Sequence, residues 1–85
     1  WGIELASPST SNSINHGIIS YGGDPAGRSG NIYMVGATPG SRLMITNSTI
    51  SNSATYGILR AAGTTNLSEA SNNFSGNAAG NIHQN

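Results

Sequence analysis

The sequence predicts an all-β fold of the parallel β-helix (solenoid) class, with about three and a half circuits of ~24 residues and three short strands in each circuit. About half of the 85 residues are Gly, Ser, Asn or Thr, which are poor residues for helix interiors. No segment repeats apolar residues at helical spacing, whereas short β-type segments bounded by Gly, Asn and Ser recur. The apolar residues also return at a regular interval, which is typical of repeat folds.

Superposing these segments places the apolar residues in columns. One column is followed by serine each time and contains Ile19, Ile50 and Phe74. A second column follows Gly or Asn each time and contains Ile3, Ile32, Ile58 and Ile82. Two shorter columns contain Ile14 with Ile45, and Leu43 with Leu67. Because neighbouring strands of a sheet lie about 4.8 Å apart, such columns are expected to fill the interior.

The spacing of the columns supports this assignment. Ile50 to Phe74 and Ile58 to Ile82 are both separated by 24 residues. The second circuit is longer, and its extra residues fall in the Gly- and Pro-containing segments 22–27 and 38–40, as insertions into solenoid loops do. Stacked Asn and Ser are expected to hydrogen-bond at the bends. A leucine-rich repeat has a similar period but needs several leucines per repeat, and this chain has four Leu in all.

A resemblance to a known family follows from these motifs. The run from Leu43 to Ser53, followed by Tyr56-Gly57-Ile58, resembles the repeat of right-handed parallel β-helix proteins, the pectate-lyase-like superfamily, of the secreted bacterial type. The resemblance covers nearly the whole chain and implies a right-handed coil and a secreted or cell-surface location. It does not imply one activity, because many functions share this scaffold.

Glu69 departs from the repeat pattern. It occupies the column of Ile14 and Ile45, where an apolar residue is expected. Two interpretations follow: the last circuit is locally out of register, or this carboxylate points outward.

The domain organisation is predicted to be one parallel β-helix segment spanning residues 1–85. The chain begins with Trp1 rather than Met, and neither end shows an amphipathic helix that would cap the stack. A circuit without a neighbour exposes unpaired backbone groups and open core. We therefore expect either a fragment of a longer solenoid or a unit whose ends stack on other copies of itself.

The composition excludes several classes of protein. The formal net charge is zero, and three scattered Arg cannot form the basic stripe that a nucleic-acid partner requires. No apolar stretch is long enough for membrane insertion. The absence of Cys removes disulfides, Cys-based zinc sites and Cys nucleophiles. Three acidic residues spread over three circuits do not predict a calcium site, and we expect no other metal and no cofactor.

An outward strip of strand residues supplies the first candidate binding residues. Its members each follow an inward isoleucine and are Glu4, Tyr33, Leu59 and His83. Polysaccharide-active relatives of the resembled family often place the substrate groove along such a face. Glu4, Tyr33 and His83 are therefore candidates for polysaccharide binding. The competing interpretation is that they are exposed strand residues without a role.

The longest predicted loop supplies further candidates. Tyr21 opens it and could stack on a sugar ring, whereas Asp24 and Arg28 lie within it. The competing interpretations are that Tyr21 packs at a bend and that Asp24 begins an Asp-Pro-Ala-Gly turn. His16 falls in a polar column near another bend, where a ladder hydrogen bond is expected.

The favoured functional hypothesis is a non-catalytic structural or adhesive module of a secreted or surface protein, with weak affinity for polysaccharide. No enzymatic constellation is visible, because glycoside hydrolysis needs two carboxylates about 5–10 Å apart and the strip contains one. One alternative is a fragment of a polysaccharide lyase or glycoside hydrolase. Another is a self-assembling filament unit that stacks through its uncapped ends.

Overall fold

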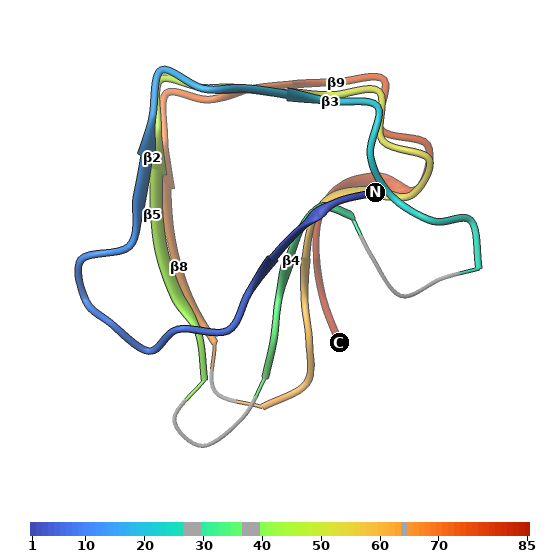
Figure 1. Cartoon of the computed structure of the whole chain (residues 1–85). Coiled ribbons are helices and arrows are strands. Elements are labelled where there is room, and N and C mark those ends of the chain that lie inside the picture. The colour runs from blue at the N-terminus through green and yellow to red at the C-terminus, as the bar shows by residue number, and fades with distance from the viewer. Residues whose placement is uncertain (27–29, 37–39, 64) are drawn as a thin grey trace.

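The computed structural model describes residues 1–26, 30–36, 40–63 and 65–85, and within these ranges it is all-β, without a helix. The described residues contain ten strands, which form three parallel sheets (Figure 1). The first sheet has the order β1 (Ile3–Leu5), β4 (Gly30–Met34), β7 (Tyr56–Arg60), β10 (Gly80–Gln84). The second has the order β2 (Ser13–Asn15), β5 (Arg42–Thr46), β8 (Asn66–Ala70). The third has the order β3 (Ile18–Ser20), β6 (Thr49–Ser51), β9 (Asn73–Ser75). The all-β prediction is confirmed.

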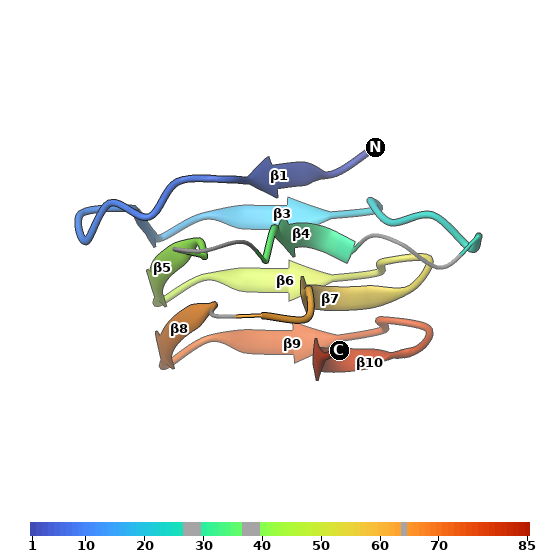
Figure 2. The same ribbon diagram turned by 90° about the horizontal axis from the view of Figure 1, so that it is seen from below.

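The chain visits the three sheets in turn, so each strand pairs with the strand three places later in the sequence. Figure 2 shows the circuits stacked as layers, with β1 at one end and β9 and β10 at the other. Parallel neighbours need a long crossover connection, and here the other two strands of the circuit provide it in place of the usual helix. This arrangement is consistent with the predicted parallel β-helix.

The predicted columns are neighbours within the sheets. One column runs through Ile3, Ile32, Ile58 and Ile82. Another runs through Ile19, Ile50 and Phe74. The shorter columns pair Ile14 with Ile45 and Leu43 with Leu67. The fully buried isoleucines lie in the second and third circuits and form the centre of the core: Ile32, Ile45, Ile50 and Ile58. The columns aligned from the sequence therefore match the observed register in all three sheets.

Two bends in each circuit use left-handed backbone conformations. The bend between the second and third sheets has positive φ at His16 (58°), Asn47 (52°) and Ser71 (58°). The bend after the third sheet has positive φ at Tyr21 (64°), Asn52 (54°) and Gly76 (65°). Asn and Gly tolerate this region best, whereas a tyrosine there is uncommon. His16 lies near a bend as predicted, and the hydrogen bond shown there runs from its backbone N–H to the Thr46 carbonyl oxygen, 3.2 Å away.

Asparagine side chains connect successive circuits at the bends. The Asn72 Oδ1 accepts the backbone N–H of Ser48 (2.9 Å), and its Nδ2 donates to the Ile45 carbonyl (2.9 Å). Asn77 does the same with the backbone N–H of Ser53 (3.0 Å) and the Ile50 carbonyl (3.1 Å). Both side chains reach into the preceding circuit. The expectation that Asn residues hydrogen-bond at the bends is confirmed.

Glu69 keeps its place in the register. Its strand partner is Ile45, so the interpretation that the last circuit is out of register is wrong. Glu69 is nevertheless exposed, and its carboxylate accepts a hydrogen bond from the Asn72 Nδ2 at 3.0 Å. Because β8 is the last strand of its sheet, no further strand covers this inward position.

Candidate functional site

The outer face of the first sheet contains the predicted strip. Glu4 pairs with Tyr33, Tyr33 with Leu59, and Leu59 with His83, so four consecutive strands place these residues side by side. All four follow an inward isoleucine, and side chains alternate between the two faces of a strand, so they share the face opposite the core. The column is confirmed as predicted.

The accessibility of this strip differs from the expectation. Leu59 is only 1 % exposed although it lies outside the main core cluster, so describing it as an exposed strand residue was wrong. It lies between Tyr33 and His83, whose larger ring side chains stand on the adjacent strands and are themselves half-buried. Within the strip Glu4 is therefore exposed, Tyr33 and His83 are half-buried, and Leu59 lies buried between them.

A stacked ring pair was not predicted from the sequence. The rings of Tyr56 and His83 lie face to face, with centroids 4.5 Å apart and planes 9° apart. Gly80, the strand partner of Tyr56, leaves space beside the tyrosine ring, since a Cβ there would lie 3.7 Å from its Cδ1. The predicted columns group residues that are direct strand partners. The strand partner of Tyr56 is Gly80, and His83 lies three residues further along β10. The pair presents a flat, partly exposed surface with a hydroxyl and an imidazole.

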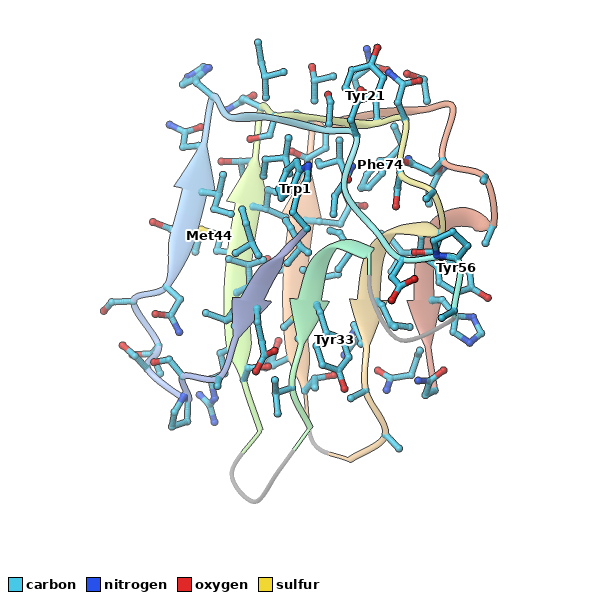
Figure 3. The ribbon with its side chains drawn as sticks, turned by 45° about the vertical axis from the view of Figure 1, so that its right-hand side comes forward. Trp1, Tyr21, Tyr33, Met44, Tyr56 and Phe74 are labelled. Atoms are coloured by element: carbon cyan, nitrogen blue, oxygen red, sulfur yellow. The ribbon has the colours of Figure 1, made fainter. Side chains whose placement is uncertain are left out.

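Tyr21 and Asp24 lie apart from this face. Figure 3 shows Tyr21 at a distance from Tyr33 and Tyr56, and its side chain is 74 % exposed. The Asp24 Oδ1 accepts the backbone N–H of Ala26 at 2.9 Å, which confirms the turn interpretation. Arg28, the remaining predicted binding residue, lies outside the described residues. The structure therefore brings Glu4, Tyr33 and His83 onto one face and leaves Tyr21 and Asp24 elsewhere.

A hollow opens at the N-terminal end of the stack. Its volume is about 220 Å³. It is lined by residues of the first two circuits: Ile3, Leu5, Asn12, Ser13, Ile14, Ile32 and Leu43. Most of this lining is apolar because it is the interior of the coil, left open above the first circuit. The expected open core is thus present at this end.

A smaller hollow of about 140 Å³ lies on the outer face of the second sheet. It is lined by Thr10, Asn12, Arg42, Leu43, Met44, Asn66 and Ser68. Arg42 and Met44 are exposed outward residues of β5, and Asn12 is bound to three backbone carbonyls, including that of Arg42 at 2.9 Å. Arg42 was not predicted as a site residue; its neighbours at this hollow come from β8 and from the segment before β2.

The groups on these surfaces can make non-covalent contacts. Ring faces, one carboxylate and several hydroxyl and amide groups can stack and hydrogen-bond. In the part of the chain that the structure describes, no three His, Cys, Asp or Glu side chains gather in a way that could hold a metal ion. Nor does any helix within those residues have the length and apolarity to cross a membrane. Comparison with protein-family models, with curated proteins and with solved structures found no match to this chain.

Proposed function

We propose that this chain is a segment of a right-handed parallel β-helix, similar to the pectate-lyase-like superfamily, and serves as a non-catalytic structural or adhesive module of a secreted or surface protein. The winding supports the handedness. In Figure 1 the chain runs clockwise from β2 through β3 toward β4, and Figure 2 places the later circuits farther from the viewer of Figure 1. A clockwise path that recedes from the viewer is a right-handed coil.

The observation that carries the structural role is the use of polar side chains to connect circuits. The amides of Asn72 and Asn77 bind backbone groups of the circuit before them, and the hydroxyls of Ser20 and Ser51 lie 2.8 Å apart. Within the described residues, every buried side-chain nitrogen or oxygen has a hydrogen-bond partner. Satisfied networks of this kind make a rigid scaffold. These polar side chains therefore stabilise the stack by connecting successive circuits.

The adhesive part of the proposal concerns the outer face of the first sheet. Glu4 and Tyr33 are accessible there, and the Tyr56–His83 pair supplies a second ring surface. Aromatic rings with a polar tip suit the apolar faces and hydroxyl groups of sugars. Weak binding of a neutral polysaccharide segment along this face is the interaction that these groups favour.

A glycan array with the wild-type chain tests this proposal. We expect binding of at least one polysaccharide, lost in Tyr33→Ala and retained in Tyr33→Phe, because the ring and not the hydroxyl makes the stacking contact. Met44→Ala removes a 51 % exposed side chain from another sheet and is the matched control. No binding to any glycan would leave only the structural role. Shortening of a bound glycan would overturn the non-catalytic assignment.

A further inference from the structure

Arg42 is an outward residue of β5, and its exposed side chain lines the smaller hollow on the second sheet. Among the residues that the structure describes, its guanidinium makes no ion pair and no hydrogen bond. Arg60, in contrast, donates to the hydroxyl and the carbonyl of Thr65. The one acidic residue in the described strands of this sheet, Glu69, lies opposite Ile45 at an inward position. The hollow therefore contains a positive charge that no described residue neutralises.

The backbone of Arg42 is fixed by the segment that precedes β2. The Arg42 N–H donates to the Ser7 carbonyl (3.1 Å), and the Asn12 Nδ2 donates to the Arg42 carbonyl (2.9 Å). The Met44 N–H donates in turn to the Asn12 carbonyl (2.9 Å). The Asn12 Nδ2 also binds the carbonyls of Ser7 and Ser9, which holds this segment as one wall of the hollow. Because the wall is already formed, a ligand would have little backbone to order on binding.

Three further polar side chains share the hollow with this guanidinium: Thr10, Asn66 and Ser68. All three are exposed, and within the described residues no hydrogen bond engages them. Asn66 is the strand partner of Arg42, and Ser68 is the strand partner of Met44. The lining comes from three successive circuits on the outer face of the sheet, so the hollow does not depend on the open ends of the coil.

We propose that this hollow binds a sulfate or phosphate ester group of a sugar, with the Arg42 guanidinium as its counter-ion. The planar fork of a guanidinium pairs with two oxygens of an oxyanion. A tetrahedral ester group has a third free oxygen, to which the hydroxyls of Thr10 and Ser68 and the amide of Asn66 can donate. The volume of about 140 Å³ admits such a group, since one water needs only roughly 10–15 Å³.

The same surface favours a sugar as the carrier of this group. β5 is paired with β2 on one side and with β8 on the other, so an extended peptide cannot add to it as a further strand. Exposed hydroxyl and amide groups both donate and accept hydrogen bonds, which suits the hydroxyl groups of a sugar ring. The hollow lies on a different sheet from Tyr33 and takes a charged ligand rather than a neutral one. This inference therefore goes beyond the function proposed above and does not rest on it.

An NMR titration of the backbone amides with glucose 6-sulfate and with glucose 6-phosphate tests the site. We expect at least one ester to shift the amide signals of β5 and β8 and to bind at least about tenfold more tightly than glucose, because it adds charge-assisted hydrogen bonds. The tighter of the two identifies the ester. Glucose binding as tightly as the esters, or shifts confined to the first sheet, would overturn the proposal. Glucuronate binding as tightly as the better ester would overturn the tetrahedral group, and equally tight inorganic sulfate would overturn the sugar.

Substitutions at Arg42 test the role of the guanidinium. Arg42→Gln should weaken binding of the better ester by about tenfold or more, and Arg42→Lys, which keeps the charge without the planar fork, should give an intermediate affinity. The amide spectrum of each variant also reports whether it is folded. Tyr33→Ala, on the outer face of the first sheet, is the control and should bind the ester as wild type does. Unchanged ester affinity in Arg42→Gln would overturn the assignment, whereas loss of neutral-glycan binding in Tyr33→Ala concerns only the function proposed above.

Discussion

The Asn31 side chain is fully buried, and both the oxygen and the nitrogen of its amide are hydrogen-bonded. Its Oδ1 accepts the Gly22 N–H at 2.7 Å, and its Nδ2 donates to the carbonyls of Ile19 (3.1 Å) and Ser51 (2.9 Å). Asn77 makes the corresponding bonds one circuit later, from a different position in the repeat. At the scale of single residues, the fold therefore depends on amide side chains that satisfy backbone groups at the bends, where strand pairing ends.

We predict that Asn31→Ala lowers the free energy of unfolding by about 2–4 kcal/mol, since each buried group left without its partner costs about 1–3 kcal/mol. Asn81 occupies the same position in β10 but is exposed, so Asn81→Ala should change stability by less than about 0.5 kcal/mol. Urea unfolding followed by circular dichroism measures both. Equal effects of the two substitutions would contradict the assigned role of Asn31.

The strands differ in how many of their faces are buried. In β5, Leu43 and Ile45 are buried while Arg42 and Met44 are exposed, which is the alternation of a strand with one face in water. In β7, Ile58 fills the interior and Leu59 is buried on the opposite face. A central parallel strand covered on both faces is expected to be apolar on both. At the scale of elements, β7 is thus buried on its outer face at Leu59, whereas the outer face of β1 is exposed at Glu4.

Leu59→Ala should therefore lower the free energy of unfolding by about 2–5 kcal/mol, the range for removing a buried leucine side chain. Met44→Ala, at an exposed outward position of β5, should lower it by less than about 1 kcal/mol. Thermal unfolding of the two variants beside wild type compares them. A Leu59→Ala protein as stable as wild type would contradict the packing role assigned to Leu59.

Burial is concentrated in the middle of the molecule. Ile32 and Ile58 are completely inaccessible to solvent, whereas Ile3 and Ile82, at the two ends of the same column, are each 39 % exposed. Inner strands have hydrogen-bonded neighbours on both sides, and the strands at each end have a neighbour on one side only. At the scale of the whole molecule, stability is expected to fall from the middle circuits toward both ends.

Amide hydrogen exchange should show this gradient. The backbone N–H groups of β5, β6 and β7 are expected to exchange more slowly than those of β1, β2 and β10, because local opening of an end strand breaks fewer contacts. Exchange followed by NMR, strand by strand, is the measurement. Uniform protection across all circuits would instead indicate that the stack opens only as one cooperative unit.

The register of the strands could be predicted from the sequence, because aligning its apolar columns matches the observed strand partners in all three sheets, including the circuits lengthened by loop insertions. The alignment of Glu4, Tyr33 and His83 on one face followed for the same reason, since side chains alternate along a strand. The alternation of side chains along a strand and the distance between repeats can both be read from the spacing of residues in the sequence.

Only the tertiary structure decided what is exposed and which rings meet. Leu59 is buried because of the side chains on neighbouring strands, and Tyr56 meets His83 across a shift of three positions that no column contains. Glu69 is in register and exposed because its strand is the last of its sheet. Solvent accessibility and ring contacts depend on how close the side chains of different circuits lie. Residue spacing in the sequence does not specify these distances, because they are set by the folded arrangement of the circuits.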